Sequence, residues 1–173
     1  DDADTPLQYT KFVKKFCGEG ENTCGNLSVP LTAGWVSDGK DSVINPTRGT
    51  YQRANFEISP AGDLRYYKAT YQHQRFFPVF QKTVLMLNGE VGYAKGLGGQ
   101  DLPFFKNFYV GGIGSVRGFE SGTLGPKDST NKMNDDADNL GGDRMINASL
   151  ELLAPLPGGD RTLRIFGFLD AGY

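Results

Sequence analysis

Three charged residues are the best candidates for a specific polar contact. Arg117 lies in a long glycine-rich stretch, and two carboxylates, Glu151 and Asp170, lie in the segments that follow it. A guanidinium presents its donors in a fixed fork that matches a carboxylate, so such a pair can hold a loop against a protein wall. Spacing alone leaves the alternative of a solvated Arg117 open.

Two cysteines suggest a disulfide rather than a metal site. Cys17 and Cys24 lie in a polar, glycine-bearing stretch, and their spacing fits no zinc finger. A loop-closing disulfide in an oxidising compartment is favoured. Two free thiols are the alternative, and no metal site is expected.

A run of glycines resembles a dinucleotide-binding loop but departs from it. From Gly112 the pattern requires a third glycine where Arg117 stands, and no helix is expected to follow. The glycines, Gly114 and Gly118 in particular, instead predict a tight turn. The acidic stretch 135–141 lacks the ligand spacing of a calcium loop.

The residues that hydrolases use are present without their usual arrangement. His73 is the single histidine, and none of Ser115, Ser121 and Ser149 lies in a G-x-S-x-G elbow. We therefore expect neither an active site nor a cofactor.

Strands must position these residues, because helical periodicity is almost absent. Apolar and polar residues alternate in segments of about ten residues bounded by Gly, Pro, Asn and Asp. The expected fold is an all-β, antiparallel up-and-down meander, with a turn at 77–81. Its six strands are expected at 27–35, 51–58, 64–77, 82–94, 146–152 and 163–171.

Counting by twos assigns side chains to faces. Glu151 falls on the polar side of its segment, with Asn147 and Ser149, and Asp170 falls on the polar side of the last segment, with Phe168. Both carboxylates should therefore face inward if the Leu and Ile faces meet lipid.

Composition excludes some classes. The chain has 173 residues and a net charge of -2, so the basic surplus typical of nucleic-acid binding is missing. No apolar run approaches the roughly 18 residues of a membrane-spanning helix. Barrel strands leave almost no hydropathy signal, and the pattern favours an outer-membrane barrel while leaving a soluble β-sandwich open.

Several segments closely resemble the BamA family of outer-membrane assembly factors. Val116, Arg117, Gly118 and Phe119 match the signature motif of its superfamily. The similarity covers nearly the whole chain after residue 27, and the stretch with the two cysteines matches least. The other matching segments are 103–112, 120–127, 45–49, 148–151 and 168–172.

The resemblance implies a fragment of a 16-strand transmembrane β-barrel, corresponding to strands eight to thirteen. On this resemblance, the periplasmic repeats, the first strand and the last three strands of the family are expected to lie outside this sequence. The implied organisation is an external loop (1–26), four strands (27–94), a long external loop folded into the lumen (95–142) and two strands (143–173).

The resemblance also implies a function. The expected role is to insert and fold outer-membrane proteins without ATP, in the bacterial outer membrane. The implied partners are the outer-membrane lipid bilayer, unfolded outer-membrane protein clients and, through the missing periplasmic part, lipoproteins of the assembly complex. The alternatives are a two-partner secretion pore that exports a passenger protein and a passive porin.

For the long loop, the resemblance implies a tip folded into the barrel. Arg117 is then expected against Asp170 on the inner wall, with Glu151 close by. Phe168 is expected to pack on the guanidinium through a cation–π contact.

Overall fold

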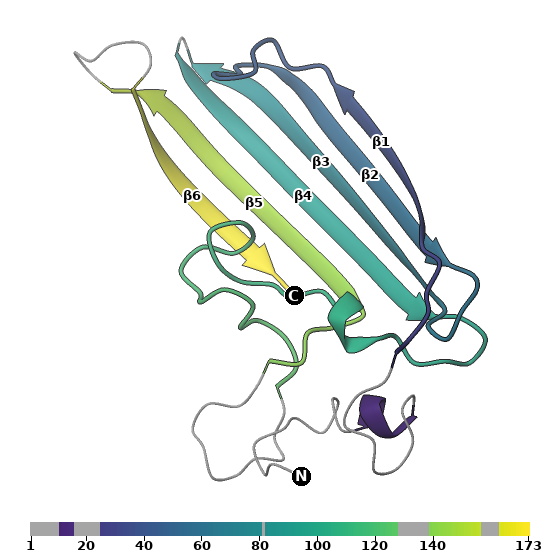
Figure 1. Cartoon of the computed structure of the whole chain (residues 1–173). Coiled ribbons are helices and arrows are strands. Elements are labelled where there is room, and N and C mark those ends of the chain that lie inside the picture. The colour runs from purple at the N-terminus through teal and green to yellow at the C-terminus, as the bar shows by residue number, and fades with distance from the viewer. Residues whose placement is uncertain (1–10, 16–24, 81, 128–138, 157–162) are drawn as a thin grey trace.

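Six strands form one antiparallel sheet in chain order (Figure 1). The structure, a computed structural model, describes residues 11–15, 25–80, 82–127, 139–156 and 163–173. The strands are β1 (Leu31–Asp38), β2 (Gly49–Ser59), β3 (Tyr66–Phe80), β4 (Thr83–Gly96), β5 (Arg144–Pro155) and β6 (Arg164–Gly172). The predicted all-β, antiparallel meander is confirmed.

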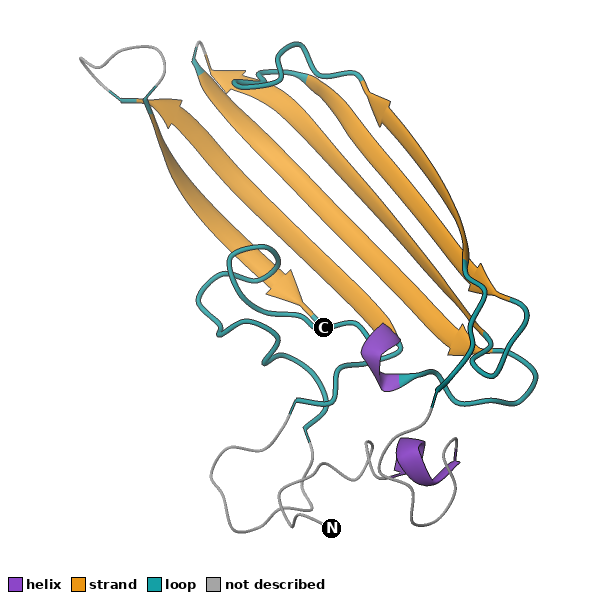
Figure 2. Cartoon of the chain, in the orientation of Figure 1, coloured by secondary structure: helices purple, strands orange, loops and turns teal. Residues whose placement is uncertain are grey.

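Helical structure is confined to two short pieces of the described chain (Figure 2). One is a helical turn at residues 11–15, and the other is the 3-10 helix η1 (Phe104–Lys106). Among the described residues, no helix is long and apolar enough to cross a membrane.

The first strand begins later than the alternation predicted. β1 starts at Leu31 rather than at residue 27. Pro30 precedes it and has no N–H to donate to a strand ladder. Ser28 instead forms an isolated bridge with Gly62, outside the regular pairing.

The predicted turn at 77–81 is wrong, because β3 continues to Phe80. Pro78 still pairs with Val84, and the register shifts between Pro78 and Phe80. A proline lacks the ladder donor but is tolerated where pairing is already irregular.

The two faces of the sheet differ in character. One face lies against the long β4–β5 connection, and we call it the loop face and the opposite one the outer face. The buried residues of the strands share the parity of the loop face: Ser59, Tyr66, Phe76, Val84, Ala94, Met145 and Asn147. Large apolar side chains stay exposed on the outer face, among them Leu31, Trp35, Phe56, Leu87, Val91, Ile146, Leu150, Leu152, Ile165 and Leu169.

The hydrophobic core lies between the long connection and the loop face. It joins Ala94 and Met145 of the sheet to Phe108, Val110 and Val116 of the connection. The long connection therefore supplies much of the core and is packed on the sheet.

Candidate functional site

Glycines shape the tip of the long connection, residues 111–118. Gly111, Gly112 and Gly118 have positive φ angles of 117°, 91° and 89°, a region that other residues rarely adopt. The N–H of Gly112 donates to the carbonyl of Val116 (3.1 Å) and closes the turn. Gly114, expected to permit the turn, is not among the residues with positive φ.

Arg117 binds Asp170 through a bidentate contact. Its Nε lies 2.6 Å from Asp170 Oδ2, and its Nη2 lies 2.6 Å from Asp170 Oδ1. The backbone N–H of Arg117 also donates to Oδ2, at 3.0 Å. The Asp170 side chain is only 2% exposed, so this carboxylate depends on the arginine for neutralisation.

Two further acceptors complete the fork of Arg117. Its Nη1 lies 2.5 Å from Glu151 Oε1, and its Nη2 donates to Ser149 Oγ at 2.9 Å. The Ser149 hydroxyl in turn donates to Asp170 Oδ1, at 2.7 Å. We call this cluster, with Phe168, the tip anchor.

Phe168 lies against the flat side of the guanidinium. The Cζ atom of Arg117 is 3.7 Å from the centroid of the Phe168 ring. This is cation–π distance, and stacking fixes the plane in which the fork must lie.

Strand register places the four wall residues of the tip anchor. Asp170 pairs with Ser149 and Phe168 pairs with Glu151, in neighbouring positions of β5 and β6. Because alternate residues share a face, all four point at the loop.

Val116 fixes the tip through packing. Val116 is 2% exposed, and a Cβ at Gly172 would lie 2.5 Å from Val116 Cγ2. Gly172 therefore leaves the space that Val116 fills. Phe119, the last residue of the motif, is 53% exposed.

Sequence reasoning placed Ser149 on the inward face with Glu151 but did not predict its contact with Arg117. It missed Gly172, although a signal was present, because Gly172 follows Asp170 by two and therefore shares its face.

The electrostatics suit a permanent anchor. Hydrogen bonds to Asp170 raise the pKa of the Arg117 guanidinium above its usual value. One positive charge faces two carboxylates, and the arginine has no proton to give up at physiological pH. The arrangement can therefore hold the loop against the wall through a charge that persists at physiological pH.

The other candidates do not converge on a catalytic site. His73 lies on the outer face of β3, whereas Ser149 lies on the loop face of β5 and binds Arg117. Ser115 Oγ accepts the N–H of Gly111 inside the tip. Among the described residues, no group of three or more His, Cys, Asp and Glu side chains could hold a metal ion.

Some sequence candidates lie outside the described residues. These are Cys17 and Cys24, whose disulfide stays a prediction, and most of the acidic stretch 135–141.

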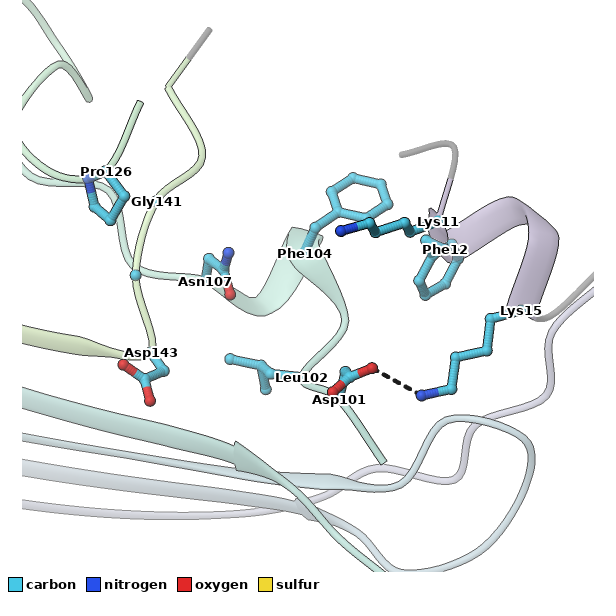
Figure 3. Close-up of a pocket in the computed structure, with 11 residues that line it drawn as sticks. Lys11, Phe12, Lys15, Asp101, Leu102, Phe104, Asn107, Pro126, Gly141 and Asp143 are labelled. Atoms are coloured by element: carbon cyan, nitrogen blue, oxygen red, sulfur yellow. Dashed lines mark hydrogen bonds and ion pairs between the residues drawn. The ribbon is translucent and has the colours of Figure 1, made fainter. Parts of the chain in front are cut away.

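A cavity of about 460 Å³ lies between the helical turn at 11–15 and the first and last parts of the long connection (Figure 3). Lys15 Nζ is 2.8 Å from Asp101 Oδ2, and the Phe12 and Phe104 rings meet edge to face at 5.3 Å. These contacts tie the helical turn to the connection, away from the tip anchor.

Comparison with known proteins identifies relatives. The Omp85 superfamily domain matches residues 4–173. The chain is 45% identical, over 96% of its length, to the outer membrane protein assembly factor BamA of Neisseria meningitidis serogroup B, and covers 22% of that protein. It is 28% identical to the human sorting and assembly machinery component 50 homolog, covering 85% of this chain and 32% of that protein.

A solved structure shares the fold. The crystal structure of BamA from Haemophilus ducreyi lacking POTRA domains 1-3 superposes with a TM-score of 0.84 at 26% identity. The match covers 99% of this chain and 36% of the other. The chain thus spans between about a fifth and a third of the length of these curated relatives.

Proposed function

Because the chain belongs to the Omp85 superfamily, we propose that it is a six-strand section of an outer-membrane β-barrel assembly factor. The complete protein, called the full-length protein below, inserts and folds other outer-membrane proteins without ATP. The names of the bacterial relatives and the similarity to a BamA barrel support this function.

The observation that carries the proposal is the tip anchor. Arg117 ties the long loop to Asp170, Glu151 and Ser149 of two neighbouring strands. A loop held this way stays on the inner wall and stiffens β5 and β6, and an incoming client strand adds at an unpaired strand edge elsewhere in the wall of the full-length protein. Main-chain pairing can drive such strand addition without a chemical step.

The faces of the sheet support a place in the outer membrane. Exposed aliphatic and aromatic side chains gather on the outer face, whereas polar side chains share the loop face. This is the pattern of a barrel wall with lipid outside and a polar lumen inside. The lipid bilayer is then one partner of the chain.

The remaining organisation follows from the same proposal. Segments 1–26 and 95–142 are external loops, the second folded into the lumen, and segments 27–94 and 143–173 form the wall. Unfolded outer-membrane proteins are the clients. Lipoproteins of the assembly complex bind a periplasmic part of the full-length protein.

Reconstitution tests this function. The full-length protein in liposomes should accelerate the insertion of an unfolded outer-membrane protein, compared with empty liposomes. Arg117→Ala should lower the insertion rate at least about tenfold, the equivalent of about 1.4 kcal/mol. Arg48→Ala is the matched control, since Arg48 is an exposed arginine of the β1–β2 turn.

Two outcomes would contradict the proposal. Insertion no faster than in empty liposomes would exclude an assembly factor. Export of a passenger protein, or a plain ion conductance without insertion, would instead indicate a secretion pore or a porin.

A further inference from the structure

The long connection touches the sheet at a second place, close to its start. Lys106, the last residue of η1, has its Nζ 2.6 Å from Glu57 Oε1 on β2. The Tyr66 hydroxyl of β3 donates to the same carboxylate oxygen. The two side chains of the ion pair are only about a quarter exposed, 26% and 25%, so water screens this pair less than a surface pair.

A second lysine supports the same contact from the sheet. Lys68 pairs with Glu57 across β2 and β3, and its Nζ donates to the backbone carbonyl of Lys106 at 2.9 Å. The same ammonium lies 4.0 Å from the centroid of the Phe108 ring. Lys68 therefore binds the connection through both a carbonyl and an aromatic face.

Phe108 sits in a space that the sheet leaves open. A Cβ at Gly92 of β4 would lie 2.7 Å from two carbons of the Phe108 ring, so no side chain fits there. Phe108 is 7% exposed, and its backbone exchanges two hydrogen bonds with Gly142, of 2.8 and 2.9 Å. Aromatic packing and backbone pairing thus hold Phe108 in place, in addition to the polar contacts of Lys106 and Lys68.

We propose that Lys106 positions the start of the long connection on the sheet, as part of a root anchor that is separate from the tip anchor. The root anchor consists of Lys106 and Phe108 of the connection with Glu57, Tyr66 and Lys68 of the sheet. The proposal rests on the function proposed above, because it assigns a role to the same loop.

The two anchors act on different strands. The polar contacts of the root anchor join the connection to β2 and β3, while its Phe108 packs on β4, and the tip anchor joins the connection to β5 and β6. The polar contacts therefore brace two parts of the sheet that do not pair with each other directly. With two separate contacts, the tip can leave the wall while the root stays in place.

Hydrogen exchange of single backbone amides in the full-length protein tests this separation. The root amides of Lys106, Asn107 and Phe108 and the tip amides of Gly112 and Arg117 each donate a hydrogen bond. Lys106→Met and Glu57→Gln should each speed exchange at the root about tenfold or more, the range of a hydrogen bond to a charged group. Exchange at the tip should stay within about twofold.

Two variants control for general loss of folding. Lys106→Arg keeps the positive charge but changes the shape of the side chain. If the charge holds the root, the root amides of this variant should stay protected, whereas a purely steric role for Lys106 would predict faster exchange. Lys127→Met removes an exposed lysine from the same connection and should leave both sets of amides unchanged.

The result that would overturn the proposal is specific. If Lys106→Met leaves the root amides protected, the ion pair does not anchor the root. If tip and root amides accelerate together, the connection is one unit and not two anchors. Neither result depends on insertion activity, so failure here is distinct from failure of the proposed function.

Discussion

The long connection meets the sheet at two places built from similar charges in different ways. At the tip, one arginine contacts two carboxylates and a hydroxyl, and the Asp170 side chain is 2% exposed. At the root, Lys106 contacts the single carboxylate of Glu57, and both side chains are about a quarter exposed.

This difference predicts how tolerant each anchor is. A guanidinium fixes several acceptors in one plane, whereas an ammonium is a compact charge on a flexible stem. A carboxylate buried as deeply as Asp170 is costly once its partner is lost, but a partly hydrated one can turn to water. We expect the tip to need its particular residues and the root to need mainly a cation.

Of the variants considered, Asp170→Asn should weaken the attachment of the tip to the wall the most. It removes the charge that accepts from Nε, Nη2 and the backbone N–H of Arg117. Breaking such a buried pair costs about 3–5 kcal/mol, so the amides of the tip should lose protection in hydrogen exchange and the insertion rate should fall.

A double variant checks that the pair is the cause. Combining Arg117→Ala with Asp170→Ala should cost little beyond the larger single effect, because residues of one network are not additive. Fully additive effects would mean that the two residues act separately.

Arg117→Lys should have the second largest effect. We expect it to lower the free energy that holds the tip on the wall by about 2 kcal/mol, the contribution of a hydrogen bond to a charged group. Lysine keeps the charge but cannot bind Asp170 through two nitrogens while also reaching Glu151. Insertion rate and tip exchange should both respond. Wild-type behaviour would show that charge alone holds the tip and would remove the contrast with the root.

Glu151→Gln should lower the free energy of unfolding less, by about 1 kcal/mol, the net contribution of a typical hydrogen bond. Glu151 makes one contact with Arg117, at Nη1, and its side chain is 16% exposed, against 2% for Asp170. A glutamine oxygen can still accept that hydrogen bond. Thermal unfolding of the full-length barrel would rank this variant against Asp170→Asn, and an equal loss would contradict the role assigned to burial.

Lys106→Arg should have the smallest effect, within about 0.5 kcal/mol, since partly exposed ion pairs contribute little beyond the presence of charge. Root exchange and insertion rate should match the wild type. A marked loss would mean that the root, like the tip, requires one particular geometry.

Much of the fold followed from alternation along the chain. Glu151, Phe168 and Asp170 were assigned to one face by parity, and the structure places all three on the loop face against Arg117. The errors arose where proline interrupts a strand: β1 begins after Pro30, and β3 continues past Pro78. A proline shows that one donor is missing but not whether a neighbouring strand tolerates the loss.

The root anchor left no comparable signal. Lys106 and Glu57 lie far apart in the chain, and nothing near either residue indicates the other. The space that the Phe108 ring fills exists because Gly92 has no side chain, and the sequence shows Gly92 only as a glycine within a strand.

The sequence by itself determined which side chains share a face, because the pleat of a strand turns successive residues to opposite sides whatever surrounds them. It also determined that the tip of the connection can turn, since a run of glycines permits backbone angles that other residues rarely adopt. Which glycines adopt positive φ angles, Gly111, Gly112 and Gly118 but not Gly114, was decided by the structure. Only the tertiary structure decided where the connection lies. That path depends on contacts between distant residues, Arg117 with Asp170 and Lys106 with Glu57, which form only once the paired strands have brought their partners to one face.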